Sequence, residues 1–393
     1  MIRHIYKRGF SLIEIILGLA VFLILMVSIF QYSGSLLRGF RPAAVVSFDS
    51  TFPNGLDLYR YGEPVCDIDQ DVTIERQIDL SSLISTSTPI TSMHYFGNDI
   101  FVFTTDSAST SQPDVFIMRQ NVNVWELVIS KDVGPGIQDS VLSFPYLYVA
   151  NTSVNSHVKV LQIDNNAIIE VQNIKIDSLA ASNSMPRRLS VFGDHLMLGA
   201  EKSNSGGELF ALPINHQNGK LSLPTHSIEL GGQAHVARVI GKDLLIANSA
   251  DPEMRVIDNN FLEKADYDAP LTLGNGKSVL SLYPYAVLGR TLGSGELTLL
   301  DISTTSIHSI DTNRTNGSVD ALQSLAGGAP NLFMALTSNA DKEIQFWNVG
   351  EDRTFHLESF INLPARTTSY LCFDKQIFVA VLINERPNLI ILK

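Results

Sequence analysis

One acidic side chain, Glu14, lies inside an otherwise apolar run that extends from Phe10 to Phe30. An apolar stretch of about 20 residues is long enough to cross a bilayer as a helix. A carboxylate in the hydrocarbon costs on the order of a few kcal/mol, so it needs a reason to be there. The chemistry that Glu14 predicts is therefore pairing with a positively charged partner inside the membrane.

The residues before this run set its orientation. Arg3, Lys7 and Arg8 give the first nine residues a charge of +3 with no acid to offset it. Basic residues ahead of an apolar span keep that end in the cytoplasm, so the rest of the chain is exported. A cleavable signal peptide and a plain membrane anchor are the two simple alternatives. Neither of them accounts for Glu14.

The segment from Lys7 to Glu14, KRGFSLIE, resembles the start of type IV prepilins and pseudopilins, with a class III-like leader. The resemblance implies that a prepilin peptidase cuts between Gly9 and Phe10 and that the new N-terminus, Phe10, is methylated. It also implies that Glu14 pairs with the free amino terminus of a neighbouring pilin subunit during assembly. The resemblance covers residues 6–40, about a tenth of the chain.

The chain departs from the usual pilin pattern soon after the span. Gly34, Gly39 and Pro42 interrupt the helix that a typical pilin continues. This departure favours a low-copy or capping subunit over a filament-body subunit. We therefore expect a leader peptide at 1–9, a transmembrane pilin-type α-helix at 10–38 and an irregular linker at 39–71.

A turn followed by a short apolar strand recurs along the remainder of the chain. Aligning the first apolar residue of each copy gives seven positions, spaced 42 to 49 residues apart: Ile100, Leu147, Leu196, Leu244, Ala286, Leu332 and Ile377. Each copy has room for four strands, and helical periodicity is absent after the anchor. The spacing predicts an all-β fold, a seven-bladed β-propeller over 72–393. A pair of β-sandwiches is the runner-up, which such regular spacing disfavours.

The two ends of the repeat array are incomplete in a complementary way. The last copy stops at its third strand, whereas residues 71–80, DVTIERQIDL, have strand character and precede the first copy. We expect residues 72–80 to supply the missing outer strand of the last blade. Such a closing strand joins the chain ends and removes two exposed sheet edges.

The loops after the second strands, for example 151–157 and 201–207, are short and rich in Ser, Thr, Asn and Gly. In an up-and-down propeller they emerge at one end, together with the connections between blades. They can form a hydrogen-bonding rim for a surface protein or glycan, or they can be polar simply because they face water. The sequence does not identify the ligand.

Four carboxylates near the start of the propeller resemble the beginning of a calcium loop: Asp67, Asp69, Asp71 and Glu75. Val72 stands where such a loop has glycine, and no acid follows at the twelfth position. A solvated acidic turn is therefore the favoured interpretation, and we predict no bound metal and no cofactor. Cys66 and Cys372 are both on the exported side, where a disulfide is allowed, but the sequence leaves their pairing open.

Composition and motifs exclude several function classes. The net charge of −12 disfavours nucleic-acid binding through phosphates, and two cysteines cannot form a four-thiolate zinc site. The chain contains no P-loop, no G-x-S-x-G and no H-E-x-x-H motif. We therefore expect a protein that is not an enzyme.

These observations predict a minor pilin or pseudopilin in the inner (cytoplasmic) membrane. Its single span would carry an extracytoplasmic propeller head for adhesion or substrate contact, with a pilus or the cell surface as a further location. The alternatives are a membrane-tethered binding scaffold and an exported propeller enzyme, neither of them assembled into a filament. The filament or secretion system is not specified by the sequence.

Overall fold

The computed structural model describes residue 68 and residues 72–393, with gaps at 85–86, 108, 110, 122–123, 154, 165, 203–205, 241, 271–272, 292, 326–330 and 374. The predicted leader, the membrane helix over 10–38 and nearly all of the linker lie outside the described residues. Within the described part of the chain, no helix has both the length and the apolarity needed to cross a membrane.

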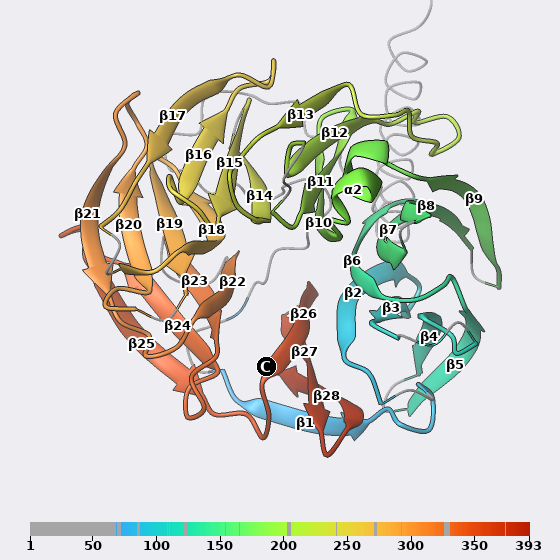
Figure 1. Cartoon of the computed structure of the whole chain (residues 1–393). Coiled ribbons are helices and arrows are strands. Elements are labelled where there is room, and N and C mark those ends of the chain that lie inside the picture. The colour runs from blue at the N-terminus through green and yellow to red at the C-terminus, as the bar shows by residue number, and fades with distance from the viewer. Residues whose placement is uncertain are drawn as a thin grey trace, which may run out of the picture. The chain divides into compact units, whose positions relative to one another are not determined.

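Seven four-stranded antiparallel sheets follow one another along the chain and are arranged as blades around a common axis (Figure 1). The predicted all-β, seven-bladed propeller is confirmed. The first strands are β2 (Ile90–Gly97), β6 (Ile137–Ser143), β10 (Pro186–Phe192), β14 (Ala234–Ile240), β18 (Gly276–Leu282), β22 (Val319–Ser324) and β26 (Thr367–Phe373). The second strands are β3 (Ile100–Thr105), β7 (Tyr146–Ser153), β11 (His195–Ala200), β15 (Asp243–Asn248), β19 (Tyr285–Arg290), β23 (Leu332–Thr337) and β27 (Gln376–Ile383).

The outer half of each blade is built in the same way. The third strands are β4 (Val115–Asn121), β8 (Ser156–Ile163), β12 (Leu209–Pro213), β16 (Met254–Ile257), β20 (Leu297–Asp301), β24 (Ile344–Val349) and β28 (Arg386–Leu392). The fourth strands are β5 (Val124–Lys131), β9 (Ile168–Ile174), β13 (His226–Ile228), β17 (Glu263–Tyr267), β21 (His308–Asn313), β25 (Phe355–Ile361) and β1 (Ile74–Asp79).

The core is divided into seven hydrophobic clusters, one at each interface between neighbouring blades. Alternate residues of a strand face opposite sides of its sheet. In β3, Ile100 and Val102 therefore pack toward blade 2, whereas Phe101 and Phe103 pack toward blade 7. Because the middle strands are covered on both faces, they are nearly continuous apolar runs, which explains why they were visible in the sequence.

The ring closes through the N-terminal strand. β1 pairs antiparallel with β28, with Ile74 opposite Leu392 and Asp79 opposite Asn388. Backbone bonds between Thr73 and Lys393, at 3.0 and 3.1 Å, extend the pairing by one residue. This is the closure predicted for the segment 71–80, and the last blade thus contains both the earliest and the latest strands of the propeller (Figure 1).

The described part of the chain contains one short helix, α2 (Asp177–Ser182), in the connection from β9 to β10. The absence of helical periodicity after the anchor predicted no helix here, and α2 corrects that prediction. Its apolar contact is Leu179, which is fully buried between blades 2 and 3. Six residues are too few to show helical periodicity, and α2 buries only one of its side chains, that of Leu179.

Candidate functional site

Of the site residues predicted from the sequence, the structure describes only Glu75. Gly9, Phe10 and Glu14 lie outside the described residues, and so do Asp67, Asp69 and Asp71. Glu75 is an exposed residue of β1, and its Oε2 accepts a hydrogen bond from Gln376 Nε2 at 2.9 Å. The described member of the acidic set thus bonds to a side chain of β27 (Gln376–Ile383) in the last blade.

A second group of polar residues surrounds the propeller axis. In every blade the first strand breaks register with the second strand at its second residue, leaving one bulged residue. A bulge redirects the side chain that it carries. All seven bulged residues are polar and half-buried, and we call them the bulge ring: Thr91, Gln138, Arg187, His235, Lys277, Asp320 and Thr368.

The bulge ring is connected across blade boundaries. Arg187 donates to Gln138 in blade 2 and also contacts Glu201, at the end of β11. Lys277 pairs with Asp320 in the next blade. Asp320 also accepts from Arg366 Nη2 at 2.5 Å, and Arg366 directly precedes β26. The ring therefore presents fixed charges at the end where the inner strands begin.

Directly below the bulge ring, Asp139 links three blades. Its Oδ1 accepts from Ser92 Oγ of blade 1 at 2.9 Å, and its Oδ2 accepts from the Leu189 backbone N–H of blade 3 at 2.8 Å. Burial raises the pKa of Asp139, and the Arg188 charge and these donors oppose that rise. The carboxylate is thus a structural junction of the inner strands and not a free acid.

Two histidines near the axis are held neutral. Burial lowers the pKa of His94 to about 4, and its Nε2 lies 2.9 Å from Ser140 Oγ. Burial also lowers the pKa of His235 to about 4, helped by the positive charges of Arg188 and Lys277. At neutral pH the positive charge at this end of the propeller therefore belongs to arginine and lysine.

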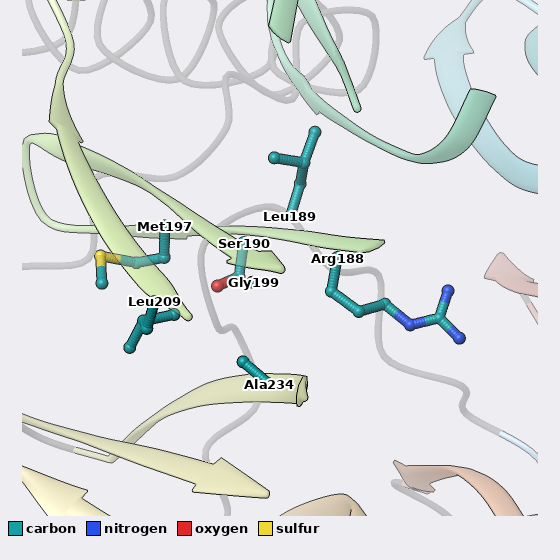
Figure 2. Close-up of a pocket in the computed structure, with 7 residues that line it drawn as sticks. All are labelled: Arg188, Leu189, Ser190, Met197, Gly199, Leu209 and Ala234. Carbon is teal, nitrogen blue, oxygen red and sulfur yellow. The ribbon is translucent and has the colours of Figure 1, made fainter. Parts of the chain in front are cut away.

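Arg188 is exposed, and its guanidinium points away from the small cavity beside it (Figure 2). That cavity lies between blades 3 and 4, and its residues are Arg188, Leu189, Ser190, Met197, Gly199, Leu209 and Ala234. Its volume is about 10 Å³, enough for about one water molecule. The Ser190 hydroxyl has no protein partner there. The cavity is a packing gap that fits a water, and the Arg188 side chain is free to meet a ligand from solvent.

Three carboxylates of blade 4, on Asp251, Glu253 and Asp268, place oxygens within 4.8 Å of one another. Oxygen donors of this kind suit a hard cation. Glu253 is buried, however, and already faces the fully buried guanidinium of Arg290 at 3.8 Å. Arg290 offsets one of the three negative charges, so the cluster fits an internal ion pair with two surface acids better than a metal site.

A polar groove of about 520 Å³ lies beside this cluster, between the outer parts of blades 4 and 5. It is lined by Asp266, Tyr267, Asp268, Pro270, Thr305, Ser306, Ile307, His308 and Ser309. Hydroxyl, carboxylate and imidazole groups dominate this lining. The groove offers hydrogen bonds of the type that a sugar or a polar peptide uses.

Sequence reasoning missed a repeated buried support under the loops. In six blades, the residue at the start of the third strand accepts a hydrogen bond from the backbone N–H two residues past the end of the fourth strand. The six pairs are Asp114–Val133 (3.2 Å), His157–Ile176 (2.8 Å), Glu208–Leu230 (2.7 Å), Glu253–Ala269 (2.8 Å), Glu296–Thr315 (3.0 Å) and Glu343–Leu363 (2.8 Å). We call these acceptors the struts. They tie the loops after the second strands to the connections between blades.

Residues 6–30 match the family model of the prokaryotic N-terminal methylation motif. No curated protein matches the chain. Among solved structures, the WD40 β-propeller domain of Doa1 has a TM-score of 0.56 at 11% identity, covering 82% of this chain and 97% of that one. Virginiamycin B lyase from Staphylococcus aureus has a TM-score of 0.56 at 13% identity, covering 82% and 99%. At such identities the likeness shows the fold alone, so the chain combines a prepilin-type methylation motif with a seven-bladed β-propeller.

Proposed function

We propose that the protein is a minor pilin or pseudopilin whose propeller is an extracellular head for adhesion or substrate contact. The observation that carries this proposal is the methylation motif at 6–30, which contains Gly9, Phe10 and Glu14. Prepilin peptidase would cut after Gly9 and methylate Phe10. Glu14 would then pair with the amino terminus of a neighbouring subunit, because an unpaired carboxylate is costly in the membrane.

The head fits a binding role in three respects. The seven inter-blade cores and the closed ring make a large scaffold in which every blade has its full four strands. The struts hold the loops at the end where the inner strands begin. That same end carries the bulge ring and the exposed Arg188, so we place ligand contact there.

The enzymatic alternative can draw on one trio among the described residues, His356, Thr354 and Asp352. His356 Nε2 lies 3.0 Å from Thr354 Oγ1 and 3.2 Å from Asp352 Oδ1, which superficially resembles a catalytic triad. A triad base, however, uses one ring nitrogen for the nucleophile and the other for the acid. Here both contacts involve the same nitrogen, in an exposed turn, and the trio therefore fits a surface hydrogen-bond cluster.

The assembly role is tested on the full-length protein in its native membrane. We expect mass spectrometry of purified material to find an N-terminus at methylated Phe10. We expect Glu14→Ala to remove the protein from sheared filaments while leaving it inserted in the membrane, and Glu351→Ala, an exposed loop acid, to behave like wild type. A protein that begins at Met1 and is absent from filaments would support the tethered-scaffold alternative instead.

The binding face is tested by charge reversal. Arg188→Glu is expected to weaken attachment of cells to their target surface at least several-fold, because it inverts the charge beside the bulge ring. Lys375→Glu makes the same change in the turn between the first and second strands of the last blade, at the opposite end of the propeller. Equal attachment by both variants would place ligand contact elsewhere.

A further inference from the structure

Four cationic side chains gather where the inner strands of blades 3, 5 and 7 begin. They are Arg187 and Arg188 of β10, Lys277 of β18, and Arg366 directly before β26, and we call them the axial cations. His235 of β14 lies between β10 and β18 around the ring (Figure 1). Burial lowers the pKa of His235, and the charges of Arg188, Lys277 and Arg187 lower it further. Three of the four cations therefore act together on one point at the start of blade 4.

Acidic side chains offset only part of this positive charge. Asp320 pairs with both Lys277 and Arg366, so one carboxylate serves two cations. Glu201 pairs with Arg187. The side chains in these ion pairs stay partly exposed, from 22% for Asp320 to 61% for Arg366, so a ligand from solvent can reach them.

Arg188 makes no ion pair with another described residue. Its side chain is exposed, and its guanidinium points away from the small cavity beside it (Figure 2). The Arg188 charge acts on Asp139, but that buried carboxylate already accepts from Ser92 Oγ and from the backbone N–H groups of Ser140 and Leu189. Four cations thus face three acids at this end, on a chain whose formal net charge is −12.

The surplus of one positive charge suits a ligand with one negative group among uncharged polar ones. A guanidinium fork matches a planar carboxylate through two parallel hydrogen bonds. The bulge ring supplies uncharged partners at the same end. Thr368 Oγ1 donates to Ala380 O at 3.2 Å and keeps its lone pairs for another donor. Gln138 uses its Oε1 for Arg187, and its amide N–H groups have no partner among the described residues.

The loops around the axial cations disfavour a polyanion. Acidic residues outnumber basic ones in the loops at this end, for example Asp132, Glu229 and Asp251. A nucleic acid or a strongly acidic protein would bring repeated negative charges against these acids and be repelled. The hydroxyl groups of a sugar are both donors and acceptors, so a glycan that ends in one carboxylate matches the centre without this repulsion.

We propose that the axial cations bind the carboxylate of a terminal acidic sugar, with Arg188 as the main contact. This inference rests on the proposed function, which places ligand contact at this end, and it adds the chemical class of the ligand. The bound carboxylate offsets the positive charge that the protein's own acids leave over.

The ligand class is tested by isothermal titration calorimetry on the full-length protein in detergent. The probes are oligosaccharides ending in glucuronate, galacturonate or sialate, each paired with the neutral oligosaccharide that lacks the carboxylate. We expect at least one acidic probe to bind at least about tenfold more tightly than its neutral counterpart, since a charged hydrogen bond is lost in the latter. Its affinity should fall as the salt concentration rises.

Equal binding of acidic and neutral probes, or no binding of any acidic probe, would overturn the inference. A peptide of consecutive glutamates that binds more tightly than every acidic sugar would also overturn it, in favour of an acidic protein ligand.

Variants locate the site on the propeller. Arg188→Gln should lose about tenfold in affinity for the acidic probe, and Arg188→Lys, which keeps the charge without the fork, should lose less. Arg353→Gln makes the same change in the turn between β24 and β25, at the opposite end, and should bind like wild type. Asp320→Asn releases Lys277 and Arg366 from their shared acid and should tighten binding several-fold, which misfolding cannot imitate. Unchanged affinity in Arg188→Gln or in Asp320→Asn would overturn the site.

Failure of this inference can be told apart from failure of the proposed function. Binding of an acidic sugar by a protein that is absent from sheared filaments would reject the assembly role and keep the site. Cell attachment that depends on Arg188, without binding of any acidic sugar, would keep the binding face and reject the ligand class.

Discussion

The Asp139 carboxylate accepts a hydrogen bond from the Leu189 backbone N–H at 2.8 Å, and so joins the inner strands of blades 2 and 3. The same side chain accepts from Ser92 Oγ of blade 1. Three of the seven blades thus meet at one carboxylate, although their contributing residues are 47 and 50 positions away from Asp139 in the chain.

Asp139→Ala is expected to lower the free energy of unfolding by about 2–3 kcal/mol, because it leaves the Leu189 N–H and the Ser92 hydroxyl without their acceptor. Denaturant unfolding followed by circular dichroism measures this change. Asp341→Ala, at an exposed loop position, is the control and should stay within about 0.5 kcal/mol of wild type. Equal midpoints for both variants would mean that Asp139 is not a junction.

Glu208 tests the role of the struts. Its Oε2 accepts from the backbone N–H groups of Leu230 and Gly231, at 2.7 and 3.2 Å. Glu208→Ala is expected to cost about 2–4 kcal/mol in unfolding free energy, since two buried donors lose their partner. Glu208→Gln keeps one acceptor oxygen and should cost clearly less. A similar loss for both variants would show that the negative charge matters more than the hydrogen bonds.

The strut of blade 1 predicts a pH dependence. Burial raises the pKa of Asp114 from its ordinary value of 3.8 to about 7, and the nearby Asp132 charge adds to the rise. The folded protein therefore binds more protons than the unfolded chain between these pH values. The contribution of Asp114 to stability is full below about pH 3.8 and is lost as the pH rises through 7.

Asp114→Asn removes this titration while keeping an acceptor for the Val133 N–H. We expect the difference in unfolding free energy between the variant and wild type to grow in favour of the variant as the pH rises from 4 to about 7. Unfolding curves recorded across that range measure the difference. A constant difference would show that the carboxyl group titrates normally.

The strut of blade 2, His157, predicts the opposite pH dependence of stability to that of Asp114. The His157 Nδ1 accepts from the Ile176 N–H at 2.8 Å, which requires a neutral ring. Burial and the charge of Lys175 lower the pKa of His157 below its ordinary value of 6.5. Its contribution is present above pH 6.5 and is lost as the pH falls below that value, so His157→Gln should be relatively more stable toward acid than at neutral pH. Parallel pH profiles for variant and wild type would contradict this.

The buried pair of Arg290 and Glu253 predicts non-additive mutations. Arg290→Met leaves the Glu253 carboxylate buried without its counter-charge, which should cost about 3–5 kcal/mol in unfolding free energy. The double variant with Glu253→Gln should recover a substantial part of that loss. A double-mutant cycle measures the coupling, and strict additivity would show that the two groups act separately.

Much of the propeller could be predicted because its signals are local. Apolar middle strands such as β3 and β7 recur with turn residues at a nearly constant spacing, and the closing strand β1 was recognisable from its strand character. The bulge ring was not predictable, since a bulge is a relationship between two strands and is not a property of either one.

The struts are marked in the sequence by recurring acidic residues, from which no buried hydrogen bond was predicted. An acid stands directly before or at the start of the third strand in five blades, for example Glu208, Glu296 and Glu343. Its partner N–H is about 20 residues away, so nothing in the local pattern shows which donor it serves. A recurrent acid at one position of a repeat indicates a buried acceptor, because a solvent-facing position would vary in residue type more freely.

The pairing of Ile74 with Leu392 has a consequence for the order in which the head can form. A chain that crosses the membrane from its N-terminal side delivers β1 first, and β1 has no mate until the final blade has emerged. Six blades can be assembled in the meantime, yet the circle stays open. The head therefore matures in a single late step, and chains stalled during export should display an unmated β-strand to quality-control proteases.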